Sequence, residues 1–258
     1  MPETPAPKSW IRPYLLAANP VSLLAVIVTH FRYPWLVALQ LVFHVCLFYA
    51  IVAPSCDWLV RVATRFRAKG KQVWLTIDDG PAGEDSLRLA EEMSRRGVQA
   101  TFFVKGKNLA RQTDVGRAVV AAGHSLANHT QTHPSPVFWF LLPRRLRAEI
   151  EACNDALREA GVTVQRWFRS PVGLKNIFLQ PTLVHNGMRF VGWSVRGKDG
   201  VTCDPEAVAR RVGENVSPGA IVLLHEGRAR SNEAILRVID ELQERGYSFV
   251  IPADEELV

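Results

Sequence analysis

Two neighbouring carboxylates, Asp78 and Asp79, follow an apolar run in the segment TIDDGPAG at residues 76–83. Side chains alternate along a β-strand, so the two carboxylates are expected to point in different directions. An Asp-Asp-Gly-Pro segment is also a common turn sequence. The pair is therefore either an acidic turn or two parts of one reaction centre.

Two histidines, His129 and His133, stand four residues apart in the segment NHTQTH. On a helical turn, side chains at positions i and i+4 point the same way, so both imidazoles could bind one metal ion. Asp79 or Asp78 could add a carboxylate from another strand end and leave one coordination position open for water. The alternative is a pair of unrelated surface histidines.

Strand-like and helix-like segments alternate through the chain from residue 72 onwards. Short apolar runs occupy residues 73–77, 101–105, 124–128, 166–170, 189–195, 220–225 and 247–251. Amphipathic stretches between them, such as 84–97, 143–161 and 231–246, each end at a glycine, a common helix stop. Seven strands that alternate with helices predict a mostly parallel sheet, either open or closed into a barrel.

Polar residues cluster at the ends of these predicted strands. Ligands bind at the carboxyl ends of the strands in both open and closed parallel α/β folds. The residues at those ends are Asp78, Asp79, His129, His133, Arg169, Asp199 and His225. Their convergence at one edge predicts a catalytic centre.

The first 56 residues differ in composition from the rest of the 258-residue chain. A helix needs roughly 20 apolar residues to cross a bilayer core of about 30 Å. Residues 35–55 meet this requirement, whereas residues 14–29 are shorter and contain Asn19 and Pro20. A membrane hairpin is the favoured interpretation; a single span and a cleaved signal peptide are the alternatives.

Basic residues beside the second apolar stretch predict its orientation. They are Arg61, Arg65, Arg67, Lys69 and Lys71, against Lys8 and Arg12 before the first stretch and Arg32 between the two. The positive-inside rule then places both flanks of a hairpin in the cytoplasm. Basic residues interleaved with apolar ones next to a span favour contact with anionic headgroups over nucleic acid.

These patterns divide the chain into a membrane anchor (1–56), a basic juxtamembrane linker (57–71) and a catalytic domain (72–258). The whole chain is 48% hydrophobic and carries a net charge of +6, which suits one large α/β domain with a small appendage. Its four cysteines form no Cys-x-x-Cys pair, so a disulfide scaffold is not expected.

Four segments, TIDDGP, HTQTH, RSPVG and LLH, resemble successive motifs of the polysaccharide deacetylase family, also called the NodB-homology family. They occur in the family's order over about residues 72–251. The resemblance implies an α/β fold, a distorted (β/α) barrel with about seven parallel strands. It also implies a hydrolase that removes acyl groups from carbohydrates with the help of one divalent metal ion, most often zinc.

The resemblance also implies roles for individual residues. By position in the motifs, the metal ligands would be Asp79, His129 and His133. Asp78 would be the general base, oriented by Arg169, which Asp199 would brace in turn, and His225 would be the general acid that protonates the leaving amine.

The expected oxyanion donor lies in the segment RSPVG, where the backbone N–H of Val172 follows Pro171. This sequence departs from the family here, since an aromatic residue is usual at the position of Val172. The family's Asp-Trp pair also appears as Asp199-Gly200, and Trp193 could replace the missing ring.

The apolar insertion GLKNIFLQPTL at 173–183 and the N-terminal helices favour a lipid-linked amino sugar as substrate. The expected enzyme removes an acetyl or formyl group from it at the cytoplasmic face of the inner membrane. One alternative is an external deacetylase of peptidoglycan or exopolysaccharide. Another is a catalytically silent carbohydrate-binding protein in the membrane.

Overall fold

A curled parallel β-sheet forms the centre of the computed structural model, which describes residues 11–29, 31–202 and 204–258. Lys8 and Cys203, which entered the sequence analysis, lie outside these residues. The strands are β1 (Val62–Ala63), β2 (Gln72–Asp78), β3 (Ala100–Val104), β4 (Ser125–Asn128), β5 (Trp167–Phe168), β6 (Arg189–Val191), β7 (Val195–Arg196), β8 (Ala220–His225) and β9 (Ser248–Phe249). They pair in the order β1-β6-β5-β4-β3-β2-β8-β7, with β9 beside β2, and every pair is parallel.

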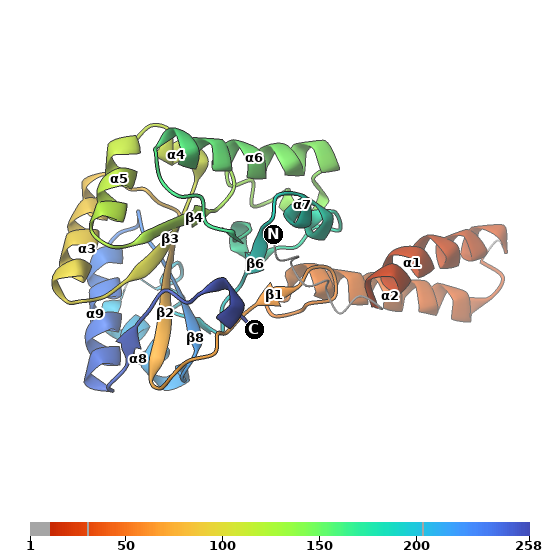
Figure 1. Cartoon of the computed structure of the whole chain (residues 1–258). Helices are drawn as coiled ribbons and strands as arrows, with labels where there is room; N and C mark the ends of the chain where they lie inside the picture. The colour runs from red at the N-terminus through yellow and green to blue at the C-terminus, as the bar shows by residue number, and fades with distance from the viewer. Residues whose placement is uncertain (1–10, 30, 203) are drawn as a thin grey trace.

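Helices surround the sheet, as expected for a distorted (β/α) barrel (Figure 1). The helices around the sheet are α3 (Glu84–Arg95), α4 (Gly106–Leu109), α5 (Thr113–Ala121), α6 (Pro143–Glu159), α7 (Leu179–His185), α8 (Pro205–Asn215) and α9 (Ser231–Glu244). Two further helices, α1 (Ile11–Val28) and α2 (Pro34–Val52), precede the barrel. Short 3₁₀ turns cover Phe138–Phe140, Pro171–Gly173 and Asp254–Glu256. The expected fold class is confirmed, and so are the helices expected near 84–97, 143–161 and 231–246.

One expected strand, residues 189–195, is divided into β6 and β7 at Gly192. The Gly192 N–H donates to the Ala63 carbonyl on one side of the sheet, whereas the Ser194 N–H donates to Ile221 on the other. A Cβ on Gly192 would lie 2.7 Å from Val62, so only glycine permits this approach. The divided strand therefore links the two ends of the sheet and curls it into a barrel.

The sheet begins earlier in the chain than expected. Val62–Ala63 pair with β6, and the flanking Val60 and Phe66 are buried, although all of these residues lie in the segment assigned to a basic linker. Arg65 in the same segment donates to Ser217 Oγ at 2.7 Å and to the Pro218 carbonyl at 2.8 Å. These residues belong to the barrel because their apolar side chains have a core to pack against.

Strand β2 shows how the core positions the catalytic edge. Its residues Val73, Leu75 and Ile77 pack in the layer between the sheet and the helices. The alternate residues face the barrel interior, where Trp74 packs 4.8 Å from the Trp167 ring. Asp78 continues this inward-facing series, so strand alternation places its carboxylate at the barrel mouth.

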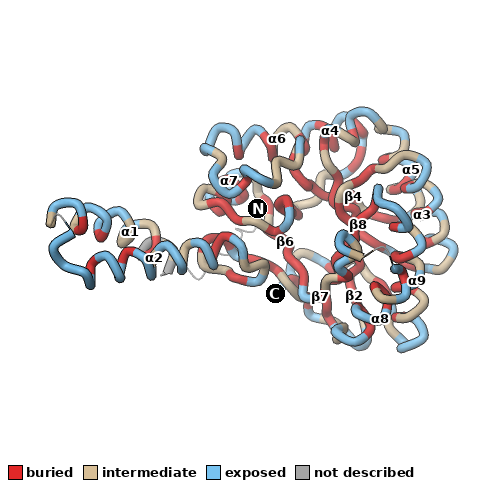
Figure 2. The backbone as a smooth tube through the Cα atoms, turned by 180° about the vertical axis from the view of Figure 1, so that it is seen from behind, coloured by how far each residue is buried: buried red, intermediate tan, exposed pale blue. Residues whose placement is uncertain are grey.

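Helices α1 and α2 form a hairpin that extends away from the barrel (Figure 1), and most of its surface is exposed (Figure 2). By length and hydropathy, α2 could cross a membrane; α1 contains a shorter apolar stretch at Leu15–Val28. Polar side chains join the helices: Ser22 donates to Gln40 Oε1 at 2.5 Å, and Gln40 donates to Asn19 at 3.2 Å. Such paired polar groups stabilise helix contacts in an apolar environment.

The apolar insertion after Val172 joins this hairpin to the barrel. Leu174 and Ile177 pack against the end of α2, whereas Leu179 lies in the barrel core. Through these contacts, the insertion lies between the hairpin and the catalytic mouth.

A buried lysine, Lys175, strengthens the same junction. Its N–H donates to the Ile51 carbonyl at 3.0 Å, and its ammonium group donates to the carbonyls of Ala53 and Pro54 just beyond α2. Burial lowers its pKa to about 8, against a smaller opposing effect of Cys56 and Asp57. Carbonyls at a helix end have no partner within the helix, and Lys175 supplies one.

Candidate active site and metal centre

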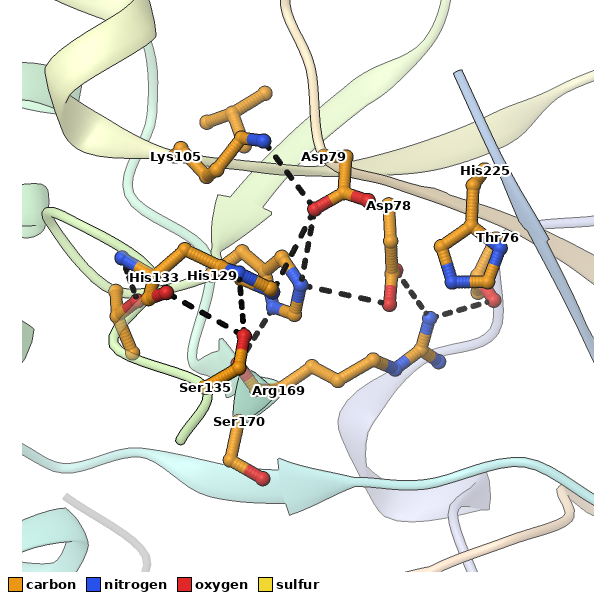
Figure 3. A network of polar contacts seen from close by, with 12 residues as sticks. Thr76, Asp78, Asp79, Lys105, His129, His133, Ser135, Arg169, Ser170 and His225 are labelled. Atoms are coloured by element: carbon orange, nitrogen blue, oxygen red, sulfur yellow. Dashed lines mark hydrogen bonds and ion pairs between the residues drawn. The ribbon is translucent and has the colours of Figure 1, made fainter. Parts of the chain in front are cut away.

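The residues selected from the sequence meet around one cavity of about 100 Å³ at the barrel mouth. Six of them line it: Asp78, Asp79, His129, His133, Val172 and His225. The other three lie directly behind, since Arg169 contacts Asp78, Asp199 contacts His225, and Pro171 precedes Val172. Figure 3 shows how side chains from separate strand ends converge at this place.

Three of these side chains form a group that could hold a metal ion. The ligand atoms of Asp79, His129 and His133 all lie within 4.8 Å of one another. Asp79 Oδ1 is 3.5 Å from His133 Nε2 and 3.9 Å from His129 Nε2, and it is buried without a hydrogen-bond partner in the described structure. The Lys105 ammonium group lies 3.3 Å from this oxygen without a hydrogen bond to it, and the oxygen and the two ring nitrogens around it could hold a cation between them.

The second nitrogen of each imidazole has its own partner. His129 Nδ1 lies 2.8 Å from the Arg169 carbonyl, and His133 Nδ1 lies 3.0 Å from Ser135 Oγ. A carbonyl only accepts, so Nδ1 of His129 carries the proton and its Nε2 is left with a lone pair. Partners of this kind orient metal-binding histidines.

The protonation states of the group also suit a cation. Burial lowers the pKa of His129, and burial together with the neighbouring His129 lowers the pKa of His133 to about 4. Burial acts to raise the pKa of Asp79, but the neighbouring imidazoles and Lys105 lower it to about 2. At neutral pH the site therefore offers two neutral imidazoles and a carboxylate, a ligand set typical of catalytic zinc sites.

The two histidines do not lie on a helical turn, and this expectation was wrong. Residues 129–134 form an irregular loop in which Thr130 and His133 have φ values of 67° and 56°. Thr130 N–H donates to Asn128 Oδ1 at 2.9 Å, and His133 N–H donates to Thr130 Oγ1 at 3.0 Å. These local hydrogen bonds to side chains compete with helix formation and bring the two rings within 4.8 Å.

Glu149 of α6 holds this loop from behind and was not identified from the sequence. Its carboxylate accepts the N–H and the hydroxyl of Thr132, each at 2.8 Å, and its carbonyl accepts the Gln131 N–H. The Glu149 side chain is buried, but nothing in the amphipathic pattern of the helix distinguishes it from the other charged residues there. Only the packing of α6 against the loop reveals it.

Asp78 is held by a buried ion pair with Arg169, as the resemblance implied. The guanidinium donates to Asp78 Oδ1 at 2.7 Å, to Thr76 Oγ1 at 2.9 Å and to the carbonyls of Val191 and Gly192. A buried charge is tolerated when it is paired and fully hydrogen-bonded, and Arg169 meets both conditions. The other carboxylate oxygen, Asp78 Oδ2, lies 3.7 Å from Nε2 of a candidate metal ligand, His129.

Asp199 contacts His225, so the expectation that it braces Arg169 was wrong. Its Oδ1 lies 2.9 Å from His225 Nδ1, and its Oδ2 accepts the His225 N–H at 2.6 Å. Burial acts to lower the pKa of His225, but the hydrogen bond and charge of Asp199, with Asp78 and Asp79, raise it overall. Both oxygens of Asp199 thus bond to His225, one to the imidazole and the other to the main-chain N–H.

Trp193 forms a wall of the cavity. It lines the cavity together with Val172, whose side chain is 54% exposed and whose φ is 48°. A Cβ on Gly173 would lie 2.6 Å from the Trp193 ring, so glycine permits the ring to approach this turn. On the other side, Arg228 occupies the space beside Gly200.

Two basic residues that the sequence analysis did not select flank Asp79. Lys105 Nζ is 3.3 Å from Asp79 Oδ1, and Arg228 is 3.4 Å from Asp79 Oδ2. They lie far from Asp79 in the sequence and belong to no motif, so only the fold identifies them. Their positive charges stabilise the ionised form of this carboxylate.

Comparisons with known proteins identify relatives of this chain. The family model described as polysaccharide deacetylase matches residues 66–191. The chain is 32% identical to a chitooligosaccharide deacetylase of Bradyrhizobium sp. (strain ANU 289) over 192 residues, 69% of this chain and 87% of that protein. It is 26% identical to a peptidoglycan-N-acetylglucosamine deacetylase of Bacillus cereus, over 75% of this chain and 72% of that protein.

A solved structure has the same fold. The family 4 carbohydrate esterase from Streptomyces lividans, in complex with acetate, superposes with a TM-score of 0.67 at 28% identity. The match covers 74% of this chain and 98% of that one. The shared part includes the barrel that carries the candidate site.

Replacing the two aspartates separately should separate their functions. Mutation of a residue that hydrogen-bonds to a metal ligand typically lowers metal affinity by about 10–100-fold. We expect Asp79→Asn to lower zinc affinity by at least this factor, because it removes a charged ligand itself. Asp78→Asn should keep about one metal per chain, since Asp78 Oδ1 is occupied by Arg169. Metal analysis after dialysis against buffered zinc measures both; equal metal content in the two variants would contradict the assignment.

Proposed function

This chain belongs to the polysaccharide deacetylase family, and we propose that it uses a divalent metal to remove an N-linked acetyl or formyl group from a lipid-linked amino sugar. Membership of the family makes it a hydrolase of carbohydrate N-acetyl bonds. One observation supports the proposed mechanism above all others. Asp78, held by Arg169, and His225, held by Asp199, line one cavity together with a group suited to a metal.

The pair Asp78–Arg169 provides the general base. Arg169 holds Oδ1, so Oδ2 remains available on the side of His129. A carboxylate in this position accepts the proton of the attacking water. A zinc ion held by Asp79, His129 and His133 would supply Lewis-acid activation of the water and the acyl carbonyl.

The pair His225–Asp199 provides the general acid. The Nδ1–H of His225 donates to Asp199, which directs Nε2 as the free proton-carrying position. When the C–N bond breaks, the protonated imidazole gives this proton to the leaving amine. The products are the free amino sugar and the carboxylic acid.

The backbone N–H of Val172 is proposed as a donor to the oxyanion that forms at the acyl carbon. The turn Pro171–Gly173 brings Val172 to the cavity that Asp78 and His225 also line. A fixed backbone donor stabilises developing negative charge without reorganisation. This role needs only the main chain, so it tolerates valine in place of an aromatic residue.

A lipid-linked substrate at the cytoplasmic face of the inner membrane is supported by the N-terminal hairpin. Helix α2 is long and apolar enough to span, and Lys175 joins its end to the turn that carries Val172. Two spans with basic flanks favour a cytoplasmic barrel. The alternative is an enzyme outside the membrane that acts on peptidoglycan or exported polysaccharide.

Removal of the proposed acid should abolish turnover and leave the metal group intact. We expect His225→Ala to lower kcat by about 10²–10⁴-fold, the usual contribution of one general acid. The assay is acetate release from N-acetylated chitooligosaccharides, with metal content measured in parallel. His185→Ala, at an exposed histidine of α7, is the control, and near-normal kcat in His225→Ala would refute the assignment.

The partner of His225 should control the pH dependence. Asp199 raises the pKa of His225, so Asp199→Asn should lower it. The acid acts when protonated, so activity is lost as pH rises through this pKa, and the alkaline limb of kcat/KM should move to lower pH. Asp114→Asn, at a highly exposed carboxylate, serves as control; an unmoved alkaline limb in Asp199→Asn would contradict the role.

The side of the membrane can be tested with reporters fused after Val258. We expect a cytoplasmically active reporter such as green fluorescent protein to fluoresce, and alkaline phosphatase to remain inactive, because both flanks of the hairpin are basic. The opposite pattern would place the barrel outside and favour the alternative substrate class. Neither result depends on catalysis.

A further inference from the structure

A second cavity, of about 540 Å³, lies between α2 and the segment that follows His133. It is lined by His44, Leu47, Phe48, Ile51, Val52, Ser135, Pro136, Trp139 and Leu174. Only His44 and Ser135 among these carry polar side chains. The cavity is thus an apolar groove with a volume typical of small-molecule sites, about 300–1,000 Å³.

Two short segments, which end the groove on one side and line the catalytic cavity on the other, place the groove next to the candidate active site. Ser135 lines the groove, and its hydroxyl lies 3.0 Å from Nδ1 of His133, which lines the catalytic cavity (Figure 3). Leu174 likewise lines the groove two residues after Val172. The groove and the catalytic cavity are therefore neighbours, separated by the contact between Ser135 and His133 and by the residues from Val172 to Leu174.

Exposed apolar side chains surround the groove on both of its walls. Phe48 on α2 is 66% exposed and Trp139 on the facing loop is 45% exposed. The same loop exposes Phe140 and Leu142, at 53% and 72%. Large exposed apolar patches mark binding or membrane surfaces, and this one adjoins the helix that could span.

We propose that this groove binds the hydrocarbon chain of the lipid-linked amino sugar. The chain enters from the bilayer along α2, and the sugar reaches the catalytic cavity past Ser135. The inference rests on the proposed function and adds the place where the lipid is recognised.

The chemistry of the lining favours a hydrocarbon chain over a peptide. Peptide groups buried in an apolar groove need hydrogen-bond partners, and unpaired groups are costly. Few polar groups line the groove: His44 Nδ1 already lies 2.8 Å from the Gln40 carbonyl, Ser135 is bonded to His133, and Trp139 adds a single indole N–H, so the lining cannot pair the successive N–H and C=O groups of a peptide. A hydrocarbon chain needs no such partners and gains from the removal of apolar surface from water.

The test compares two substrates in the full-length protein in detergent micelles. One is N-acetylglucosamine linked through phosphate to a polyprenyl chain, and the other is a chain-free chitooligosaccharide. The groove variants are Phe48→Gln and Trp139→Ser. Val45→Gln and Val184→Gln are the controls, because these residues are exposed on α2 and α7 but do not line the groove.

The groove variants should lower kcat/KM for the chain-bearing substrate by about tenfold, through KM, because each removes contacts with a few methylene groups. Activity on the chain-free substrate should stay unchanged, and the controls should change neither. An unchanged kcat/KM for the chain-bearing substrate, or an equal loss for both substrates, would overturn the proposal.

A binding measurement separates failure of the groove from failure of the function. If the wild-type protein deacetylates neither substrate, the proposed function fails and the groove is judged by photolabelling. A diazirine-bearing polyprenyl phosphate N-acetylglucosamine should label residues 44–52 and 135–139, and excess unlabelled sugar-bearing lipid should suppress the labelling. Equal labelling by photoreactive phosphatidylcholine, without such competition, would identify bulk lipid contact and overturn the inference.

Discussion

The buried guanidinium of Arg169 is the interaction on which the barrel mouth depends. Its donors reach Asp78 at the end of β2, Thr76 within β2, and the carbonyls of Val191 and Gly192 where the sheet closes. A charge without such partners would be very costly in the interior, so the strand ends must keep this arrangement. The requirement for pairing thus connects closure of the barrel with the position of the proposed base.

The same residue also connects the base to the candidate metal group. The Arg169 carbonyl accepts from His129 Nδ1, which leaves His129 Nε2 directed towards Asp78 and Asp79. His225 approaches from β8 with its own carboxylate, Asp199. The proposed base and the proposed acid are therefore held by different partners, Arg169 and Asp199, so that each can keep the protonation state that its proposed role requires.

The N-terminal hairpin and the catalytic mouth form neighbouring parts of one surface. The insertion after Val172 packs on the end of α2, and the loop after His133 faces the same helix across the apolar groove. The turn that holds the proposed oxyanion donor is only a few residues away from this junction along the chain. The proposed sites for the lipid chain and for the acyl group are thus connected by two short segments.

Some features of this protein follow from local sequence alone. Alternating apolar runs and amphipathic stretches predicted most strands and the long helices, and the apolar composition of residues 35–55 predicted the long α2 helix. The strand ends predicted which polar residues would meet. These features can be predicted because the periodicity and the length of an apolar segment are properties of a few helical turns or of one strand.

Other features depend on contacts between distant segments and were decided only by the tertiary structure. Asp199 bonds to His225 instead of Arg169, the histidines lie on a loop shaped by Asn128 and Thr130, and Glu149 supports that loop from α6. Gly192 divides a continuous apolar run because Val62 crosses beside it. The sequence by itself determined most of the chemical groups at the barrel mouth. Lys105 and Arg228 beside Asp79, the partners of the catalytic groups and the groove beside them required the fold, because hydrogen bonds and packing join residues that no local pattern relates.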